Sequence, residues 1–318
     1  MRFDVELLPL IACPKCRESL VVEGVGASLS CARCLAVYPI VGGVPRFVSA
    51  ENYAASFGYQ WKIHARTQLD SFTGLPISSD RLFLASAWPR DMSGETVLEA
   101  GSGAGRFTEV LLSTGAHVVS VDYSAAVEAN ALNNGAARGL LLCQADIFSL
   151  PVRERSFDRV MCLGVLQHTP DPPRAFQSLA RAVRSGGSLV VDAYENRVMS
   201  MMHWRYFLRP LARRMSRETL YKWTERLVPP LVAPAALLRR WFGRVGARVL
   251  PISEFSYLGL PPNINRQWAI LDTFDMLSPR FDYPQSLSTV RTWFEACNFS
   301  DVVVFRGPNG IIGRGVAP

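Results

Sequence analysis

A glycine-rich segment at residues 97–108 constrains the fold of this chain more than any other feature. It begins with an apolar run that reaches an acidic residue, Glu99, and continues with glycines at alternate positions, Gly101, Gly103 and Gly105. Glycine is needed where a backbone turns tightly or where a ligand must approach the main chain closely. A strand that passes through such a turn into a helix is typical of a nucleotide-type ligand at the carboxyl edge of a parallel sheet. The segment therefore predicts an α/β fold.

The glycine spacing differs from the fingerprint of dinucleotide-binding proteins. That fingerprint, Gly-x-Gly-x-x-Gly, would place its last glycine at position 106, where this chain has Arg106. The carboxylate of Glu99 disfavours a pyrophosphate and favours a cationic group such as an ammonium or a sulfonium. Asp122 ends the next apolar run, where a carboxylate can bind both ribose hydroxyls, and Asp146 follows a third run and suits an adenine amino group.

Residues 99–187 resemble the core of class I S-adenosylmethionine-dependent methyltransferases, in the style of the small-molecule enzymes of quinone pathways. The resemblance rests on the glycine loop, Asp122, the segments 146–151, 156–158 and 166–168, and the turn at 185–187, in this order. It implies a Rossmann-like, doubly wound, mostly parallel sheet that binds S-adenosylmethionine. The cofactor-binding residues that it implies are Glu99, Gly101, Ser102, Gly103, Gly105, Asp122, Tyr123, Asp146, Ile147, Cys162 and Gly164.

By the same resemblance these residues divide among the parts of the cofactor. Glu99 and the glycines hold the methionine end, Asp122 holds the ribose, and Asp146 with the backbone of Ile147 holds the adenine. An ordinary α/β domain with glycine turns is the alternative, and it would require these acidic and glycine positions to coincide by chance.

Four cysteines near the amino terminus form two Cys-x-x-Cys pairs, Cys13 with Cys16 and Cys31 with Cys34. Two such pairs predict a tetrahedral zinc site, and zinc supplies stability that a module of under fifty residues cannot draw from its core. A four-thiolate site leaves no open position, so we expect a structural zinc ion. The segment through residue 45 also resembles the short zinc-ribbon proteins that partner RNA and release-factor methyltransferases. Two disulfides are disfavoured because the amino terminus lacks a hydrophobic signal core.

The 318 residues divide into five predicted parts. These are a zinc ribbon (1–48), a helical connector that covers the cofactor (49–92), the cofactor-binding core (93–195), a helical insert (196–285), and a carboxyl-terminal helix with an antiparallel edge strand (286–318). Tyr59, Trp61 and Arg66 of the connector are candidates to close over the cofactor. The longest apolar stretch, 228–238, contains three prolines and is too short for a bilayer span, so we expect a cytoplasmic protein.

Positive charge is concentrated in the insert. Residues 197–248 contain 12 Lys and Arg and 2 Asp and Glu, a balance of +10, whereas the whole chain carries +7. Apolar side chains recur at the spacing of one helical face, with arginines on the other: Trp204, Phe207, Leu208 and Leu211 against Arg205, Arg209 and Arg213. Because the insert follows the fifth strand, we expect a substrate lid for a large, partly apolar, anionic molecule, or for a membrane surface that carries one. A helical pair that merely covers the core is the alternative.

Methyl transfer from a sulfonium needs an aligned nucleophile and exclusion of water more than covalent help. An oxygen or carbon nucleophile also needs a base, and His168, directly after the fourth strand, is the leading candidate. Packing at a helix start is its alternative role. Weaker candidates for the base or the pocket are His64, Asp192, Asp272, Asp275 and Tyr283.

Asp171 is predicted to cap a helix that begins at Pro172. The same segment superficially resembles the motif of methylases that act on amino groups of bases, but Arg174 stands where a stacking aromatic would be required. We therefore expect a methyltransferase that acts on oxygen or carbon of a small or lipid- or glycan-linked acceptor. An RNA methyltransferase that uses the ribbon and the arginine-rich insert is one alternative, although no base-stacking motif favours nucleic acid. A non-catalytic protein that only binds S-adenosylmethionine is the other.

Overall fold

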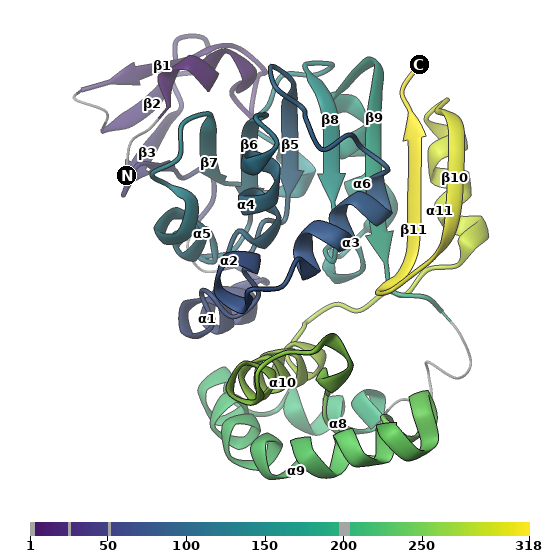
Figure 1. The fold of residues 1–318 in the computed structure, drawn as a ribbon. Helices are drawn as coiled ribbons and strands as arrows, with labels where there is room; N and C mark the ends of the chain where they lie inside the picture. The colour runs from purple at the N-terminus through teal and green to yellow at the C-terminus, as the bar shows by residue number, and fades with distance from the viewer. Residues whose placement is uncertain (1–3, 25–26, 50–51, 197–203) are drawn as a thin grey trace.

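The computed structural model describes residues 4–24, 27–49, 52–196 and 204–318, so residues 197–203 of the basic insert lie outside the described residues. A seven-stranded sheet with helices on both faces forms the centre of the molecule (Figure 1). A small ribbon lies against one edge of this sheet, and a helical insert lies beyond the carboxyl ends of its parallel strands.

The ribbon is a four-stranded antiparallel meander. A short helix precedes it, and its strands pair in sequence order: η1 (Val5–Leu10), β1 (Leu20–Glu23), β2 (Ser28–Cys31), β3 (Val37–Val41) and β4 (Val44–Pro45). The ribbon has little core of its own, and its buried side chains Leu29 and Tyr38 join the same apolar cluster as Leu150 and Val152 of the central domain. Burial of the ribbon is therefore continuous with burial of the large sheet.

The ribbon is also hydrogen-bonded to the central domain. The Ala12 N–H donates to the Pro151 carbonyl at 3.0 Å, and the Phe47 N–H donates to the Gln144 carbonyl at 2.8 Å. The Arg17 side chain donates to the Leu150 carbonyl at 2.8 Å. These bonds attach the ribbon to the edge strand of the large sheet and to the loop that follows it.

Five parallel strands form the predicted core, in the order expected of a doubly wound sheet. They are β5 (Thr96–Ala100), β6 (His117–Asp122), β7 (Leu140–Gln144), β8 (Phe157–Cys162) and β9 (Val183–Ala193). The full strand order is β10-β11-β9-β8-β5-β6-β7. The order reverses at β5, and the strand next to it, β8, begins the other half of the sheet, so their carboxyl ends form a ligand crevice.

Two strands, not one, complete the sheet. β11 (Gly310–Val316) lies between β9 and β10 (Ser300–Gly307) and runs antiparallel to both. The prediction of an antiparallel edge strand within residues 286–318 is wrong in direction, because β10 at the edge runs the same way as the parallel strands. Ile311 and Ile312 are fully buried, which explains why β11 takes the interior position.

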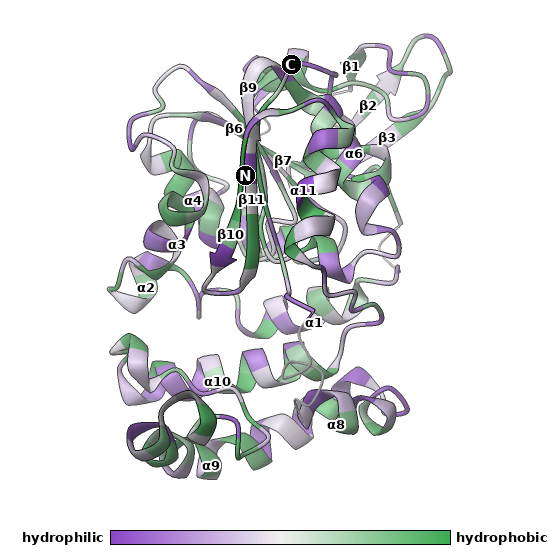
Figure 2. Cartoon of the chain, turned by 90° about the vertical axis from the view of Figure 1, so that its right-hand side faces the viewer, coloured by the Kyte–Doolittle hydropathy of each residue, from purple (hydrophilic) through white to green (hydrophobic). Residues whose placement is uncertain are grey.

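Helices cover both faces of the sheet (Figure 2). One face is covered by α3 (Ile77–Ser86), α4 (Arg106–Ser113) and α5 (Val127–Asn134), and the other by α6 (Pro172–Ala182) and α11 (Leu287–Ala296). The predicted start of α6 is confirmed, since the Asp171 side chain accepts a hydrogen bond from the Arg174 N–H at 3.1 Å. Two further helices, α1 (Ala55–Ile63) and α2 (Asp70–Thr73), precede α3 near the carboxyl ends of the strands.

The insert consists of α8 (Trp204–Ala212), α9 (Arg217–Gly246) and α10 (Pro262–Leu277), with the short helix η4 (Ser256–Leu258) between the last two. It has its own apolar cluster, which includes Tyr221 and Phe274, and α10 lies between the sheet and the two outer helices (Figures 1 and 2). α8 has the two predicted faces, but Arg205 and Arg209 are buried while Phe207 and Leu211 are exposed.

Candidate functional site

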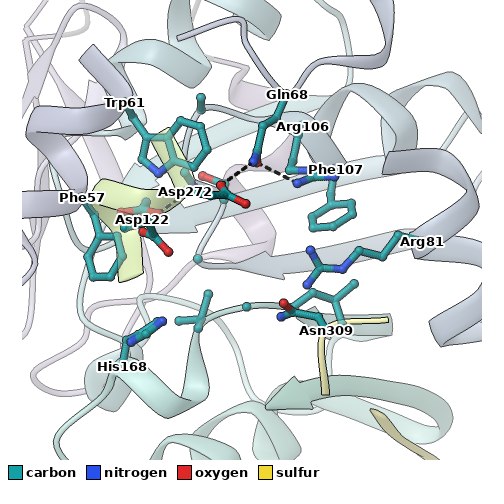
Figure 3. A pocket seen from close by; sticks show the side chains of 18 of the residues that line it. Phe57, Trp61, Gln68, Arg81, Arg106, Phe107, Asp122, His168, Asp272 and Asn309 are labelled. Carbon is teal, nitrogen blue, oxygen red and sulfur yellow. Dashed lines mark hydrogen bonds between the residues drawn. The ribbon is translucent and has the colours of Figure 1, made fainter. Parts of the chain in front are cut away.

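A cavity of about 670 Å³ opens at the carboxyl ends of the parallel strands. Its walls come from the glycine loop after β5, from α1 and α3, from η4 and α10 of the insert, and from the turn between β10 and β11. In Figure 3, Trp61 and Asp122 lie on one side of the view, and Arg106 and Arg81 lie on the other. The volume is that of a site for drug-sized ligands.

The glycine loop requires glycine for different reasons at its different positions. Gly101 has a φ of 83°, and a Cβ atom there would lie 2.1 Å from the Val165 side chain. Gly103 has a φ of 54°, and a Cβ there would lie 3.1 Å from the indole nitrogen of Trp61. The loop therefore presents bare main chain to the cavity, with Trp61 of α1 beside it.

Asp122 is the last residue of β6, and its side chain hydrogen-bonds to the glycine loop after β5 and to Ser124 in the loop after β6. One carboxylate oxygen accepts a hydrogen bond from the Gly103 N–H at 2.8 Å, and the other accepts from the N–H and the hydroxyl of Ser124 at 2.8 and 2.7 Å. Burial raises the pKa of Asp122. Asp122 lines the cavity, and the oxygen that accepts from Gly103 has a second lone pair that can accept a hydrogen bond from a ligand hydroxyl.

The structure places eight of the twelve predicted cofactor and catalytic residues on the cavity wall. They are Gly101, Ser102, Gly103, Asp122, Tyr123, Ile147, Gly164 and His168. The Ser102 hydroxyl is buried without a hydrogen-bond partner among the described residues, so a polar ligand could satisfy it. The remaining four, Glu99, Gly105, Asp146 and Cys162, are not part of the wall.

Glu99 lies beneath the loop in a buried polar network. One of its carboxylate oxygens accepts hydrogen bonds from Thr108 at 2.5 Å and Ser120 at 2.8 Å. Asn130 donates to the same Thr108 hydroxyl at 2.9 Å. The other oxygen, Oε1, has no partner among the described residues, and burial raises the pKa of Glu99 to about 7. In this arrangement Glu99 holds α4 and β6 to β5.

The other three residues off the wall have structural contacts. A Cβ at Gly105 would lie 2.2 Å from the Asn130 side chain, so this glycine allows α4 to approach α5. Asp146 accepts a hydrogen bond from the Phe148 N–H at 3.0 Å and caps η2 (Ile147–Ser149). Cys162 is fully buried at the end of β8, and burial raises its pKa.

His168 lies on η3 (Leu166–His168), which follows β8. Its ring nitrogen Nδ1 is 3.0 Å from the Phe281 carbonyl oxygen, and its ring packs against Phe57 and Tyr194 with centroids 5.3 and 5.4 Å away. A carbonyl oxygen can only accept, so Nδ1 must carry the proton. In neutral His168 the lone pair is therefore on Nε2, and the side chain lines the cavity (Figure 3).

Of the weaker candidates for the base or the pocket, some line the cavity and others do not. Asp272 and Asp275 of α10 line the cavity, and burial together with the neighbouring Asp275 raises the pKa of Asp272 to about 7. His64 is instead buried against the insert, 2.8 Å from the Tyr221 hydroxyl. Tyr283 is 45% exposed, and Asp192 is held behind the wall by Arg81.

Of the three residues expected to close over the cofactor, only Trp61 lines the cavity. Tyr59 packs within the insert against Tyr221 and Phe274. Arg66 is exposed on the surface with its guanidinium 5.1 Å from the Phe72 ring. The part of the wall that comes from α1 consists of Phe57, Gln60 and Trp61, so Trp61 is the one member of the predicted set that contributes.

Two arginines on the wall were not recognised in the sequence as ligand-binding residues. Arg106, the first residue of α4, donates to Ser78 at 3.0 Å and to Gln68 at 2.7 Å, and Gln68 in turn donates to Asp272 at 3.1 Å. Among the described residues Arg106 has no ion-pair partner, whereas Arg81 pairs with Asp192 at 2.6 Å. Burial and the nearby Arg81 lower the pKa of Arg106 to about 9, so it remains charged at neutral pH.

The sequence did contain a signal for Arg106, namely its position directly after Gly105. A residue at the start of that helix faces the ligand side of the sheet.

The arginines of the basic insert have other roles. None of those in the described part of residues 197–248 lines the cavity. Arg209 pairs with Asp282 and donates to the Met276 carbonyl at 2.8 Å, so it holds the insert together.

The four predicted metal ligands come together in the ribbon. The sulfur atoms of Cys13, Cys16, Cys31 and Cys34 all lie within 4.8 Å of one another. The Cys13 and Cys34 sulfurs are 3.5 Å apart, and the Cys16 and Cys31 sulfurs are 3.4 Å apart. This spacing and this all-thiolate donor set fit one tetrahedral zinc ion with a structural role.

Two family models match this chain. Residues 98–191 match the methyltransferase domain family, and residues 4–43 match the Trm112p-like protein family. The chain therefore contains a class I S-adenosylmethionine-dependent methyltransferase domain, preceded by a Trm112-like zinc ribbon.

Curated relatives align with the methyltransferase domain. The ubiquinone biosynthesis O-methyltransferase of Coxiella burnetii is 35% identical over 101 residues, 31% of this chain and 43% of that protein. The protein of the same name from Xylella fastidiosa is 30% identical over 114 residues, 35% of this chain and 46% of that protein. The chain thus spans less than half the length of the curated relatives it matches.

Solved structures are similar at lower identity. A complex that contains the Haloferax volcanii Trm112 methyltransferase activator aligns with a TM-score of 0.47 and 14% identity, covering 85% of this chain and 99% of that one. The CurJ carbon methyltransferase aligns with a TM-score of 0.46 and 13% identity, covering 84% of this chain and 61% of that one.

Proposed function

We propose that this protein transfers a methyl group from S-adenosylmethionine to oxygen or carbon of a partly apolar, anionic acceptor. The observation that carries the proposal is one continuous cavity, which joins the glycine loop and Asp122 to a wall with aromatic side chains and Arg106. The guanidinium of Arg106 has no ion-pair partner among the described residues. A cofactor site and an acceptor site in one cavity are what a direct transfer requires.

The residues present fit the cofactor. S-adenosylmethionine supplies, when bound, a methyl group activated by a positively charged sulfur. Asp122 would hold the ribose, the bare loop at Gly101 and Gly103 would allow the methionine part to approach the main chain, and the buried Ser102 hydroxyl would gain a partner. The apolar wall around Ile147 excludes water from the adenine.

His168 is proposed as the general base. Its Nδ1 proton is committed to the Phe281 carbonyl, so Nε2 can accept a proton from a hydroxyl or an acidic carbon. The bond to Phe281 also stabilises the protonated ring once it forms, because both nitrogens are then donors.

Arg106 is proposed to bind the anionic group of the acceptor. Its guanidinium lies 4.9 Å from the Phe107 ring and 5.7 Å from the Trp268 ring, and its hydrogen-bond partners are neutral. A charged group among aromatic rings suits an acceptor that combines an anion with an apolar part. Small molecules and lipid- or glycan-linked molecules are the acceptor class that this wall favours.

The proposal can be tested with methyl-labelled S-adenosylmethionine and a cell extract, separated after reaction into lipid, aqueous small-molecule and nucleic-acid fractions. We expect label in the lipid or small-molecule fraction. Label that is removed by ribonuclease would instead establish RNA methylation, and cofactor binding without any labelled product would favour a non-catalytic role.

The role of Arg106 is tested by Arg106→Gln, which keeps a hydrogen-bond donor beside Gln68. With the acceptor found above, we expect KM for the acceptor to rise at least about tenfold while the affinity for S-adenosylmethionine is unchanged. Arg90→Gln, on the surface in the segment that follows α3, is the matched control. Weaker cofactor binding in Arg106→Gln with an unchanged acceptor KM would overturn the assignment.

A further inference from the structure

The outer surface of α9 carries a continuous row of exposed apolar side chains. Trp223, Leu227, Leu237 and Trp241 are 52%, 50%, 56% and 74% exposed. Exposed Pro230 and Pro234 bridge the gap, so the row advances by three or four residues at each step over Trp223, Leu227, Pro230, Pro234, Leu237 and Trp241. This spacing places all six on one face of the helix, and we call this row the α9 ladder.

Cations follow the α9 ladder along one side. Lys222, Arg226 and Arg240 are exposed, and each stands one residue before a member of the ladder, so all three lie on the same flank. Acidic residues are rare here, with only Glu218 and Glu225 in residues 197–248.

The helix α8, which precedes α9 in the chain, also exposes apolar side chains. Phe207 is 72% exposed and Leu211 is 58% exposed, while Arg205 and Arg209 of the same helix are buried. This orientation is the reverse of an ordinary amphipathic surface helix, in which the apolar face is buried. Large aromatic side chains turned outward on two helices are the signature of an interaction surface.

We propose that the α9 ladder, together with the exposed face of α8, docks on an anionic lipid bilayer. Two tryptophans, leucines and a phenylalanine beside lysine and arginine are the composition of helices that lie in a membrane interface, where rings enter the headgroup region and cations meet lipid phosphates. A second copy of the chain fits less well, because its own ladder would bring the same cations against Lys222, Arg226 and Arg240. Within the described part of the chain, no helix is long and apolar enough to cross a membrane.

The position of α10 relates this surface to the cavity. One side of α10 packs in the insert core through Ile270 and Phe274, and another contributes Trp268, Asp272 and Asp275 to the cavity wall. α10 therefore lies between the sheet and α9, which carries the docking surface (Figure 2), and it also lines the cavity. The docking inference does not depend on methyl transfer.

The test uses the full-length, zinc-loaded chain and vesicles of phosphatidylcholine alone or mixed with phosphatidylglycerol. We expect co-sedimentation with the mixed vesicles that weakens as salt is added, and quenching of tryptophan emission by brominated acyl chains. The double variant Trp223→Ser/Trp241→Ser should bind the mixed vesicles at least about tenfold more weakly, because each tryptophan buries a large apolar area. The triple variant Lys222→Gln/Arg226→Gln/Arg240→Gln should lose about fivefold in affinity for each cation removed.

Leu132→Ser is the matched control, since Leu132 of α5 is 84% exposed and lies outside the insert. It should bind vesicles as the unsubstituted protein does, and circular dichroism should show every variant folded. Failure of the unsubstituted protein to bind mixed vesicles at low salt would overturn the proposal, as would equal binding by the double-serine variant. A dimer seen by light scattering and lost in the double-serine variant would also overturn it, because the occupant would then be a second copy.

Discussion

Acidification should weaken the contact between α1 and the insert through His64. This side chain is 6% exposed, and its two ring nitrogens lie 3.3 Å from the Thr67 hydroxyl and 2.8 Å from the Tyr221 hydroxyl. Burial lowers the pKa of His64 to about 4. The imidazole is therefore mostly neutral in the folded protein above that pH.

The magnitude follows from the difference between the folded and unfolded pKa values. In the unfolded chain the pKa of a histidine is about 6.5, so between pH 6.5 and 4 the unfolded chain binds a proton that the folded protein does not. This contribution to stability is fully present above pH 6.5 and declines as the pH falls. It amounts to a loss of about 2 kcal/mol at pH 5 and about 3 kcal/mol near pH 4.

The measurement is the free energy of unfolding in urea at pH 7.5 and at pH 5, for the unsubstituted protein and for His64→Gln. Glutamine does not titrate, so its variant should lose about 2 kcal/mol less stability between the two pH values. The comparison cancels the titration of all other groups. Identical pH dependence in the two proteins would refute the reasoning and would show that His64 is accessible to protons in the folded state.

Three further substitutions test the metal and cofactor residues. Cys31→Ser should release zinc and lower the melting temperature of the ribbon, measured by elemental analysis and calorimetry; an unsubstituted protein purified without zinc would contradict the assignment. Asp122→Ala should weaken S-adenosylmethionine binding about 10- to 100-fold by isothermal titration while the circular dichroism spectrum is retained, and an unchanged affinity would exclude the ribose role. His168→Asn should lower kcat about 10²- to 10⁴-fold with cofactor affinity unchanged, and full activity would exclude it as the base.

The parallel core could be predicted because its signals are local. The apolar run before the glycine loop and the one that ends in Asp122 each span only a few consecutive residues. The turn at Gly101 needs a positive φ, which glycine adopts readily. β11 could not be recognised in the same way. Its sequence contains three glycines, and it becomes a strand because β9 and β10 supply hydrogen-bond partners on both sides.

In the candidate site, too, local features could be predicted from the sequence and contacts between distant segments could not. The residues on the loop and at the ends of β6 and β8 follow from topology. The burial of Arg106, in contrast, depends on Gln68, which precedes α2, and on α3 and α10, which pack around the guanidinium. Similarly, the two faces of α8 are visible in the sequence, but which face points outward is decided by Asp282, a residue seventy positions away that pairs with Arg209. The arginines of α8 can be read from the sequence, but the distant acidic residue that pairs with one of them cannot.

The attachment of the ribbon to β7 has a consequence for solubility. β7 lies at the end of the sheet order, and all five of its residues are buried, although an edge strand ordinarily offers free backbone groups to other chains. Phe47 and the residues of β4 cover part of that edge, and the Phe47 N–H occupies the Gln144 carbonyl. The ribbon thus acts as a cap against edge-to-edge aggregation, and a shortened protein that begins at residue 49 would expose an apolar strand ready to pair with its own copies.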